Sequence, residues 1–103
     1  MATYAVSFNI KYDSEASYTE RYSSFMSRMR QISGRMWAET TSFCLCETDL
    51  DMESFERSLW LTSFDATKDK MLVLDVHYDS AIARGSLDYP STLRALLPLV
   101  SVK

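Results

Sequence analysis

Large apolar side chains alternate with small or polar ones without a break from Tyr4 to Tyr12. The first set is Tyr4, Val6, Phe8, Ile10 and Tyr12, and the second set is Ala5, Ser7, Asn9 and Lys11. Because successive side chains of a strand point to opposite faces of a sheet, this segment predicts a strand with one core face and one small polar face. The polar face ends near Asn9. If helices cover the other side, a site or a partner is expected on this face.

Two later segments have the apolar spacing of helices. Asp13-Ser14-Glu15 offers turn and capping chemistry, and aromatic and methionine side chains then recur through residues 18–32, which predicts a long amphipathic helix that Gly34 ends. A second helix is predicted after a cap at Asp49 or Asp51, ending by about Ser63. Its inward positions are Met52, Phe55 and Leu59, with Trp60 at the edge.

Two further segments are typical of strands. Residues 35–48 are rich in aromatic and β-branched residues and exceed one ordinary strand, so they are predicted to bend near residues 39–41 or to form two strands. Residues 71–78 repeat the alternation of the first strand. The predicted inward residues are Phe43, Leu45, Leu72, Leu74 and Val76, and the predicted outward residues are Ser42, Cys44, Cys46, Val73, Asp75 and His77.

The last quarter of the chain is less regular. Residues 79–86 are predicted to be a loop, and Pro90 suits the first turn of a short helix over residues 91–97. Residues 99–102 predict a last short strand. Its exposed edge would pair most simply with a second copy of the chain.

The order of these elements predicts one domain over residues 1–103. With 47% hydrophobic residues, a chain of this length can bury one ordinary core and has no room for a second. We predict an α+β, ferredoxin-like sandwich. It would have an antiparallel-type sheet of about four strands, two helices on one face and a short C-terminal helix.

Charge and composition narrow the expected partners. The net charge is −3, which argues against binding nucleic acid through a strong positive field, although Arg21, Arg28, Arg30 and Arg35 form a basic stretch. Arg21, Arg28 and Arg35 are therefore the candidate nucleic-acid contacts. No run of about 20 apolar residues could span a membrane, and the first residues do not resemble a secretion signal. A cytoplasmic protein is expected.

Two cysteines and the single histidine are the only candidates for soft-metal or nucleophile chemistry. Cys44 and Cys46 would lie about 7 Å apart on one side of a strand, a spacing that disfavours a disulfide, so reduced thiols are expected. With His77 they would supply three zinc ligands at most, without the usual paired spacing. Nucleophile chemistry would need His77 beside one of these thiols or beside Ser42, and a lone strand histidine is more often a packed residue.

Several strings resemble a known group of small nucleases. They are Phe8-Asn9-Ile10 in the first strand, Ser17-Tyr18-Thr19 with Tyr22 in the first helix, Met36 to Phe43 in the long strand segment, and the pattern of residues 48–59 followed by residues 71–76. Together with length and element order, they resemble the CRISPR-associated endonucleases that accompany the spacer integrase and the related virulence-associated protein D ribonucleases. The likeness covers residues 3–78 and fits a separate bacterial branch of that superfamily.

This resemblance implies a ferredoxin-like homodimer with a metal-dependent phosphodiesterase site at the two-fold axis. In those nucleases an aspartate near the end of the first strand is proposed to hold a divalent cation, and the matching position here is Asn9. An amide offers an oxygen ligand without the charge that magnesium prefers, so two Asn9 residues would bind the ion poorly. Asp13 and Asp75 are the remaining acids that could supply charge.

The expected function is therefore a homodimeric interaction or nucleic-acid-associated module without catalysis and without a cofactor. The dimer would form through the open sheet face or through the C-terminal strand, with RNA or DNA as a possible further partner. The alternative is a magnesium-dependent endoribonuclease or DNase that uses Asp13 or Asp75, with Arg28 and Arg35 steering the phosphate backbone. A third class is a small-molecule or metal sensor built on Cys44, Cys46 and His77.

Overall fold

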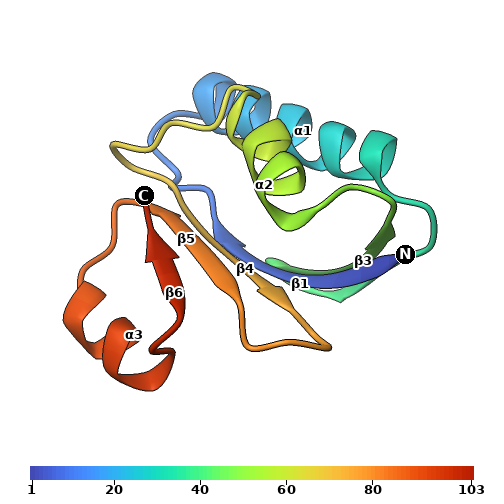
Figure 1. Cartoon of the computed structure of the whole chain (residues 1–103). Helices are drawn as coiled ribbons and strands as arrows, with labels where there is room; N and C mark the ends of the chain where they lie inside the picture. Colours follow the sequence, from blue (N-terminus) through green and yellow to red (C-terminus); the bar gives the residue numbers. More distant parts are fainter.

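The computed structural model describes residues 1–103, and all of its strands belong to one sheet (Figure 1). Helices α1 and α2 cover one face of this sheet, whereas α3 lies on the opposite side, next to the last strand. In chain order the elements are β1 (Ala2–Asn9), α1 (Glu15–Ile32), β2 (Met36–Thr40), β3 (Phe43–Thr48), α2 (Met52–Trp60), β4 (Lys70–Asp75), β5 (Ala81–Gly85), α3 (Pro90–Leu96) and β6 (Val100–Val102).

The sheet has six strands in the order β2-β3-β1-β4-β5-β6. Neighbouring strands are antiparallel except β5 and β6, which are parallel. The predicted ferredoxin-like sandwich with an antiparallel-type sheet of about four strands, two helices and a short C-terminal helix is therefore wrong. The chain is α+β, but its sheet is mixed and α3 is the crossover between two parallel strands.

The strand that the sequence interpretation missed is β5. Residues 79–86 were predicted to be a loop, yet Ala81, Ile82 and Ala83 are buried in β5. The short strand predicted at residues 99–102 exists as β6, and it pairs with β5 of its own chain. Parallel strands need a long crossover, and α3, predicted at this place, supplies it.

Side-chain caps fix the start of both long helices. The Ser14 hydroxyl accepts a hydrogen bond from the Ser17 N–H at the start of α1, and the Asp51 carboxylate accepts one from the Ser54 N–H, at 2.8 Å, at the start of α2. These caps satisfy N–H groups that have no partner inside the helix. Helix α1 ends at Ile32 as predicted, but Gly34 does not close it in a left-handed conformation, because Gly85 is the only glycine with a positive φ.

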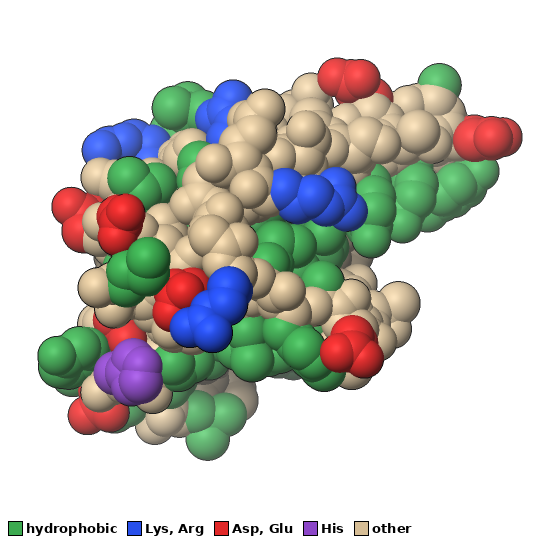
Figure 2. Space-filling model, turned by 90° about the vertical axis from the view of Figure 1, so that its right-hand side faces the viewer, with side chains coloured by type: hydrophobic (Ala, Val, Ile, Leu, Met, Phe, Trp, Pro, Cys, Tyr) green, Lys and Arg blue, Asp and Glu red, His purple; other side chains and the backbone are tan.

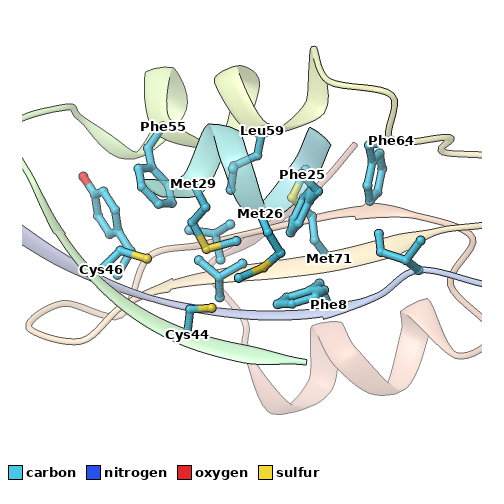
Figure 3. Packing of buried hydrophobic residues seen from close by; sticks show 14 residues of the cluster. Phe8, Phe25, Met26, Met29, Cys44, Cys46, Phe55, Leu59, Phe64 and Met71 are labelled. Atoms are coloured by element: carbon cyan, nitrogen blue, oxygen red, sulfur yellow. The ribbon is translucent and has the colours of Figure 1, made fainter. Parts of the chain in front are cut away.

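The core lies between the sheet and the two helices α1 and α2 (Figure 3). The apolar face predicted for the first strand is confirmed, although β1 ends at Asn9 and Tyr12 is exposed. Helix α1 contributes Phe25 and Met29, and helix α2 contributes Phe55, each with no measurable exposure. This side of the sheet is called the covered face below, and the opposite side is called the open face.

Two strands present the opposite faces from those predicted. Residues directly opposite each other in an antiparallel pair share a face, and Val6, a core residue, lies opposite both Cys44 and Val73. Cys44, Cys46, Met71 and Val73 are therefore buried under the helices, and Phe43, Leu45, Leu72 and Leu74 point to the open face. Residues 35–48 form two strands, and the turn between them contains Ser42 at φ 56°. The error is one of register, since a shift of one residue exchanges the faces of a strand.

Candidate interaction surface on the open face

The open face carries more apolar side chains than the small, polar face that the sequence predicted. None of its five large apolar side chains is fully buried, and the Trp37 side chain is 40% exposed. Trp37 and Phe43 form an edge-to-face aromatic pair with ring centroids 6.4 Å apart. The five side chains are Trp37 of β2, Phe43 and Leu45 of β3, and Leu72 and Leu74 of β4. Contiguous exposed apolar surface of this kind marks an interaction site.

Hydrophobic groups also reach the surface on a neighbouring side of the molecule. Figure 2, which looks at the right-hand side of Figure 1, shows hydrophobic side chains gathered at the surface between scattered acidic and basic groups. Such mixed surroundings are typical of the rim of a protein interface.

Strand β1 forms a shallow centre between the larger side chains of its neighbours. The small residues predicted for this face, Ala5, Ser7 and Asn9, do point to it. Ser7 lies opposite Phe43 on one side and opposite Leu72 on the other. The open face is therefore a trough with apolar flanks, and its floor is made of small side chains.

Helix α3 borders this trough along β5 and leaves two hollows beside the sheet. One, of about 420 Å³, lies near the end of β1 and is lined by Asn9, Lys70, Leu72 and Leu93 among others. The second, of about 310 Å³, lies further along β4 and is mostly apolar. Its lining includes Leu74, Leu96, Leu97 and Leu99, of which Leu96 and Leu99 are largely exposed.

Asn9, the position predicted to match the nuclease aspartate, is one of the residues that line the first hollow. Its cross-strand neighbour is Lys70, whose Nζ lies 3.4 Å from an Asp88 carboxylate oxygen. The polar groups next to Asn9 are thus one cation and its paired acid. Nowhere in the 103 residues do three or more His, Cys, Asp or Glu side chains converge in a way that could hold a metal ion.

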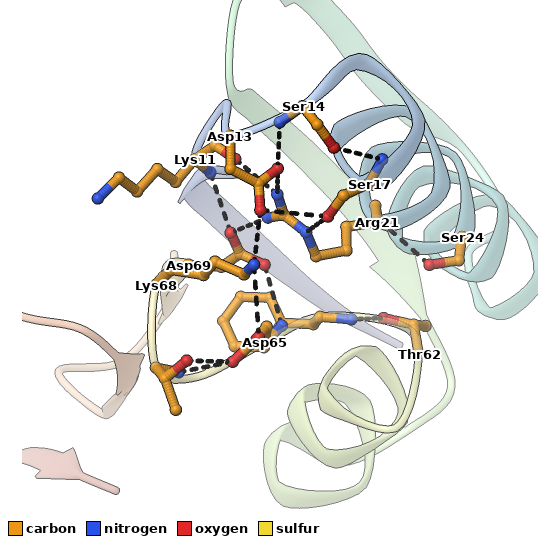
Figure 4. A network of polar contacts seen from close by, with 12 residues as sticks. Lys11, Asp13, Ser14, Ser17, Arg21, Ser24, Thr62, Asp65, Lys68 and Asp69 are labelled. Carbon is orange, nitrogen blue, oxygen red and sulfur yellow. Dashed lines mark hydrogen bonds and ion pairs between the residues drawn. The ribbon is translucent and has the colours of Figure 1, made fainter.

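Asp13 lies beyond the end of β1 in a network of polar contacts with α1 and the loop before β4 (Figure 4). One of its oxygens accepts from Lys68 Nζ at 2.6 Å, and the other accepts from Arg21 Nη2 at 2.8 Å. The hydrogen bond from Lys68, followed by those from the Ser14 N–H and from Arg21, holds the pKa of Asp13 well below its ordinary value. Both oxygens of this candidate metal ligand are therefore already bonded to cations.

The centre of this network is a buried ion pair between Arg21 and Asp69. Asp69 has no exposed surface, and besides the guanidinium it accepts the backbone N–H groups of Lys11 and Asp65, each at 2.9 Å. Burial alone would lower the pKa of Arg21, but the hydrogen bonds and charges of Asp69 and Asp13 outweigh it and raise this pKa. The network joins the end of β1, the helix α1 and the loop before β4. Arg21, a predicted nucleic-acid contact, is only 4% exposed in this chain.

Asp75 and His77 lie at the opposite end of the sheet from Asn9. Asp75 is opposite Tyr4 in the β1–β4 pair, whereas Asn9 is opposite Lys70, so five residues, or about 16 Å, separate the two ends. Asp75 shares the covered face with Tyr4, which corrects its predicted outward direction. Burial, then the charges of Asp75 and Asp51, raise the pKa of Tyr4. The candidate acid Asp75 therefore does not converge with Asn9.

The proposed set of two thiols and an imidazole is not brought together either. Cys44 and Cys46 are free and buried under α1 and α2. Burial raises the pKa of the Cys44 thiol to about 11 and also raises that of Cys46, so both are protonated at neutral pH. His77 is exposed in the turn after β4, where its backbone N–H donates to Asp75 Oδ1 at 3.0 Å.

The other two arginine candidates lie apart from each other, Arg28 on the helical side and Arg35 on the open face beside Trp37 and Leu45. Arg28 donates to the Ser58 carbonyl at 3.0 Å and so links α1 to α2. Arg35 is 88% exposed and pairs in a two-pronged contact with Glu47 of β3. Since Arg21 is buried, the basic stretch read from the sequence does not form one surface.

Two buried ion pairs were missed by the sequence interpretation. Besides Arg21 and Asp69, the fully buried Glu56 of α2 receives the guanidinium of Arg84, which also lies 4.2 Å from the centre of the Trp60 ring. A signal did exist. Arg21 and Glu56 both fall on the apolar stripes of their helices, three or four residues from core positions, where a charge has to find a partner.

Comparison of the chain with protein-family models, with curated proteins and with solved structures found no match. The resemblance to CRISPR-associated and virulence-associated nucleases therefore remains a prediction. None of the three helices is long and apolar enough to cross a membrane.

Proposed function

We propose that this chain is a homodimeric interaction module that binds the open face of a second copy through its own open face. The supporting observation is the set of five incompletely buried apolar side chains on β2, β3 and β4, of which α3 approaches only Leu72 and Leu74. Covering such a surface removes apolar area from water at about 25 cal/mol per Å². No catalytic role is assigned to the face.

A second copy fits this surface better than a nucleic acid does. Arg21 is buried, and Arg28 links α1 to α2. On the open face, Arg35 is paired with Glu47, and Lys70, beside Asn9, is paired with Asp88. A trough with apolar flanks can be complementary to itself, as a two-fold interface requires. The C-terminal strand, the other predicted dimer contact, is the weaker choice because β6 has only three residues and already pairs with β5.

The nuclease alternative is not supported by the positions of its acids. Asp13 is bound to Lys68 and Arg21, while Asp75 lies at the far end of β4 on the covered face. Two-metal or one-metal phosphodiester cleavage needs carboxylates that converge on one point. For this reason the interaction module is the function we propose.

Analytical ultracentrifugation of the purified chain tests the proposal. We expect a species of twice the 11.9 kDa chain mass at micromolar concentration. Leu45→Lys on the open face should dissociate it, because a charge would be buried without a partner. Leu61→Lys is the matched control, since Leu61 is 62% exposed at the end of α2 on the helical side. A monomeric wild type, or equal loss of the dimer in both variants, would contradict the proposal.

A further inference from the structure

Helix α3 limits how much of the open face a second sheet can cover. Two sheets packed face to face lie about 10 Å apart, and a helix with its side chains is itself about 10 Å thick. Because α3 lies on the open-face side next to β5 and β6, it fills that layer there. Only β2, β3, β1 and β4 are left for a partner sheet.

The same helix selects the direction of the two-fold axis. An axis in the plane between the sheets can run across the strands or along them. With an axis perpendicular to the strands, α3 would lie over the partner's α3 in a layer that holds only one helix. With an axis parallel to the strands, α3 lies beside the partner's β2, at the edge of the partner's sheet. The axis therefore runs along the strands.

The number of free strands fixes where this axis lies. To cover all four strands in both copies, it has to pass midway between β3 and β1, the central pair of the four. This operation places β3 over the partner's β1 and β2 over the partner's β4. A shift by one strand toward β4 would push β2 into the partner's α3, and a shift the other way would leave Leu72 and Leu74 uncovered.

Register then determines which side chains meet. A two-fold axis parallel to the strands leaves the position of every residue along the strand direction unchanged. One row of paired residues runs across β2, β3, β1 and β4 and consists of Trp37, Leu45, Ala5 and Leu74. Trp37 therefore lands over the partner's Leu74. This is the mouth of the 310 Å³ hollow that Leu74 lines together with leucines of α3 and of the segment after it, among them Leu96.

We infer that Trp37 of each copy inserts between the partner's Leu74 and the partner's Leu96, so that α3 clasps the edge strand of the other subunit. This inference rests on the proposed homodimer and specifies its geometry. Trp37 is 40% exposed and Leu96 is 75% exposed in the single chain, and the contact would bury both. Buried tryptophans in apolar pockets are frequent centres of binding energy.

The size of the face indicates that α3 has to take part. Four strands about 4.8 Å apart and five residues of about 3.3 Å give a flat strip of roughly 300 Å². A stable interface buries about 800 Å² of accessible surface on each partner. Contacts between α3 and β2 at both edges add area that the flat strip lacks.

Complementary charge variants test this geometry without a structure of the dimer. Trp37→Lys and Leu96→Glu should each weaken self-association about tenfold or more, because each buries a lone charge. In an equimolar mixture the heterodimer has one Lys–Glu contact and one unchanged Trp–Leu contact. We therefore expect the mixture to form dimers in ultracentrifugation at concentrations where each variant alone is monomeric.

Thr92→Glu is the matched control, because Thr92 is an exposed residue of α3 outside the lining of either hollow. It should dimerise alone and should not rescue Trp37→Lys. Circular dichroism verifies that every variant is folded. A dimeric wild type without rescue in the Trp37→Lys and Leu96→Glu mixture overturns the clasp geometry alone. A monomeric wild type overturns the proposed homodimer and the clasp with it.

Discussion

The two faces of the sheet are built from the same strands and differ in what covers them. On the covered face, Val6, Met71 and Val73 lie under aromatic side chains of α1 and α2 and are almost fully buried. On the open face, the intervening residues Leu72 and Leu74 are only partly buried although they are equally apolar. The chain thus has two apolar faces, of which α1 and α2 cover one, whereas α3 borders only an edge of the other. Apolar residues that a chain does not cover itself are most simply explained by a partner.

The charges are distributed just as unequally. Both buried ion pairs, Arg21 with Asp69 and Glu56 with Arg84, belong to the covered side, where they link helices to strands or loops. The ion pairs beside the trough, Lys70 with Asp88 and Arg35 with Glu47, are both accessible to solvent. Folding of the covered side therefore depends on charges, whereas association through the open face is expected to depend on apolar contact.

The largest effect is expected from Asp69→Ala. It would leave the Arg21 guanidinium buried without its main partner and remove the acceptor of the Lys11 and Asp65 N–H groups. Loss of one partner of a buried pair lowers the free energy of unfolding by about 3–5 kcal/mol. Urea denaturation measures this loss in the free energy of unfolding. Asp88→Ala removes an exposed pair and should cost about 0.5 kcal/mol or less. Equal effects would contradict the contrast between the two sides.

Neighbouring residues of β4 give the next largest contrast. Met71→Ala opens a cavity in the core and should lower the free energy of unfolding by about 2–5 kcal/mol at any protein concentration. Leu72→Ala, one residue on, removes a half-buried side chain of the open face. Its effect should be smaller in dilute protein and should grow with concentration, because it also weakens the dimer. Denaturation at two concentrations separates these contributions. A Leu72→Ala effect that is independent of concentration would count against a role for this side chain in association.

Local chemistry made much of the fold predictable. The alternation in β1, the spacing of Phe25, Met29 and Phe55 and the cap at Asp51 each depend on neighbours within one turn or one strand. The facing of β3 and β4 was not predictable in this way, because both faces of these strands are apolar and alternation alone cannot say which is inside. The short strand β5 was missed for a related reason: three buried residues between polar flanks give too little pattern.

The candidate site was predicted only in part. The small side chains of β1 on the open face, including Asn9, were placed correctly, but their apolar flanks were not, because those depend on the register of two other strands. Asp13 was recognised as a charge near the end of β1. Its actual partners, Arg21 and Lys68, are eight and 55 residues away in sequence. Such pairings are set by tertiary structure, and spacing in a sequence does not reveal them.

The smallest effect is expected from acid titration of Asp13, and it sharpens the contrast in charges. Its pKa is lowered by hydrogen bonds from Lys68, Ser14 and Arg21, so the folded chain favours the ionised form more than the unfolded chain does. The resulting stability is fully present above the ordinary aspartate pKa of about 3.9 and is lost as the pH falls below it toward the lowered folded value. Asp13→Asn should therefore weaken the decline of stability with acid below about pH 4, as measured by thermal melting at several pH values. Asp79→Asn, at an exposed residue of the turn after β4, is the control and should leave the decline unchanged. If Asp13→Asn and wild type lose stability in parallel, the contacts of Asp13 do not contribute to folding, and acid acts elsewhere on the covered side.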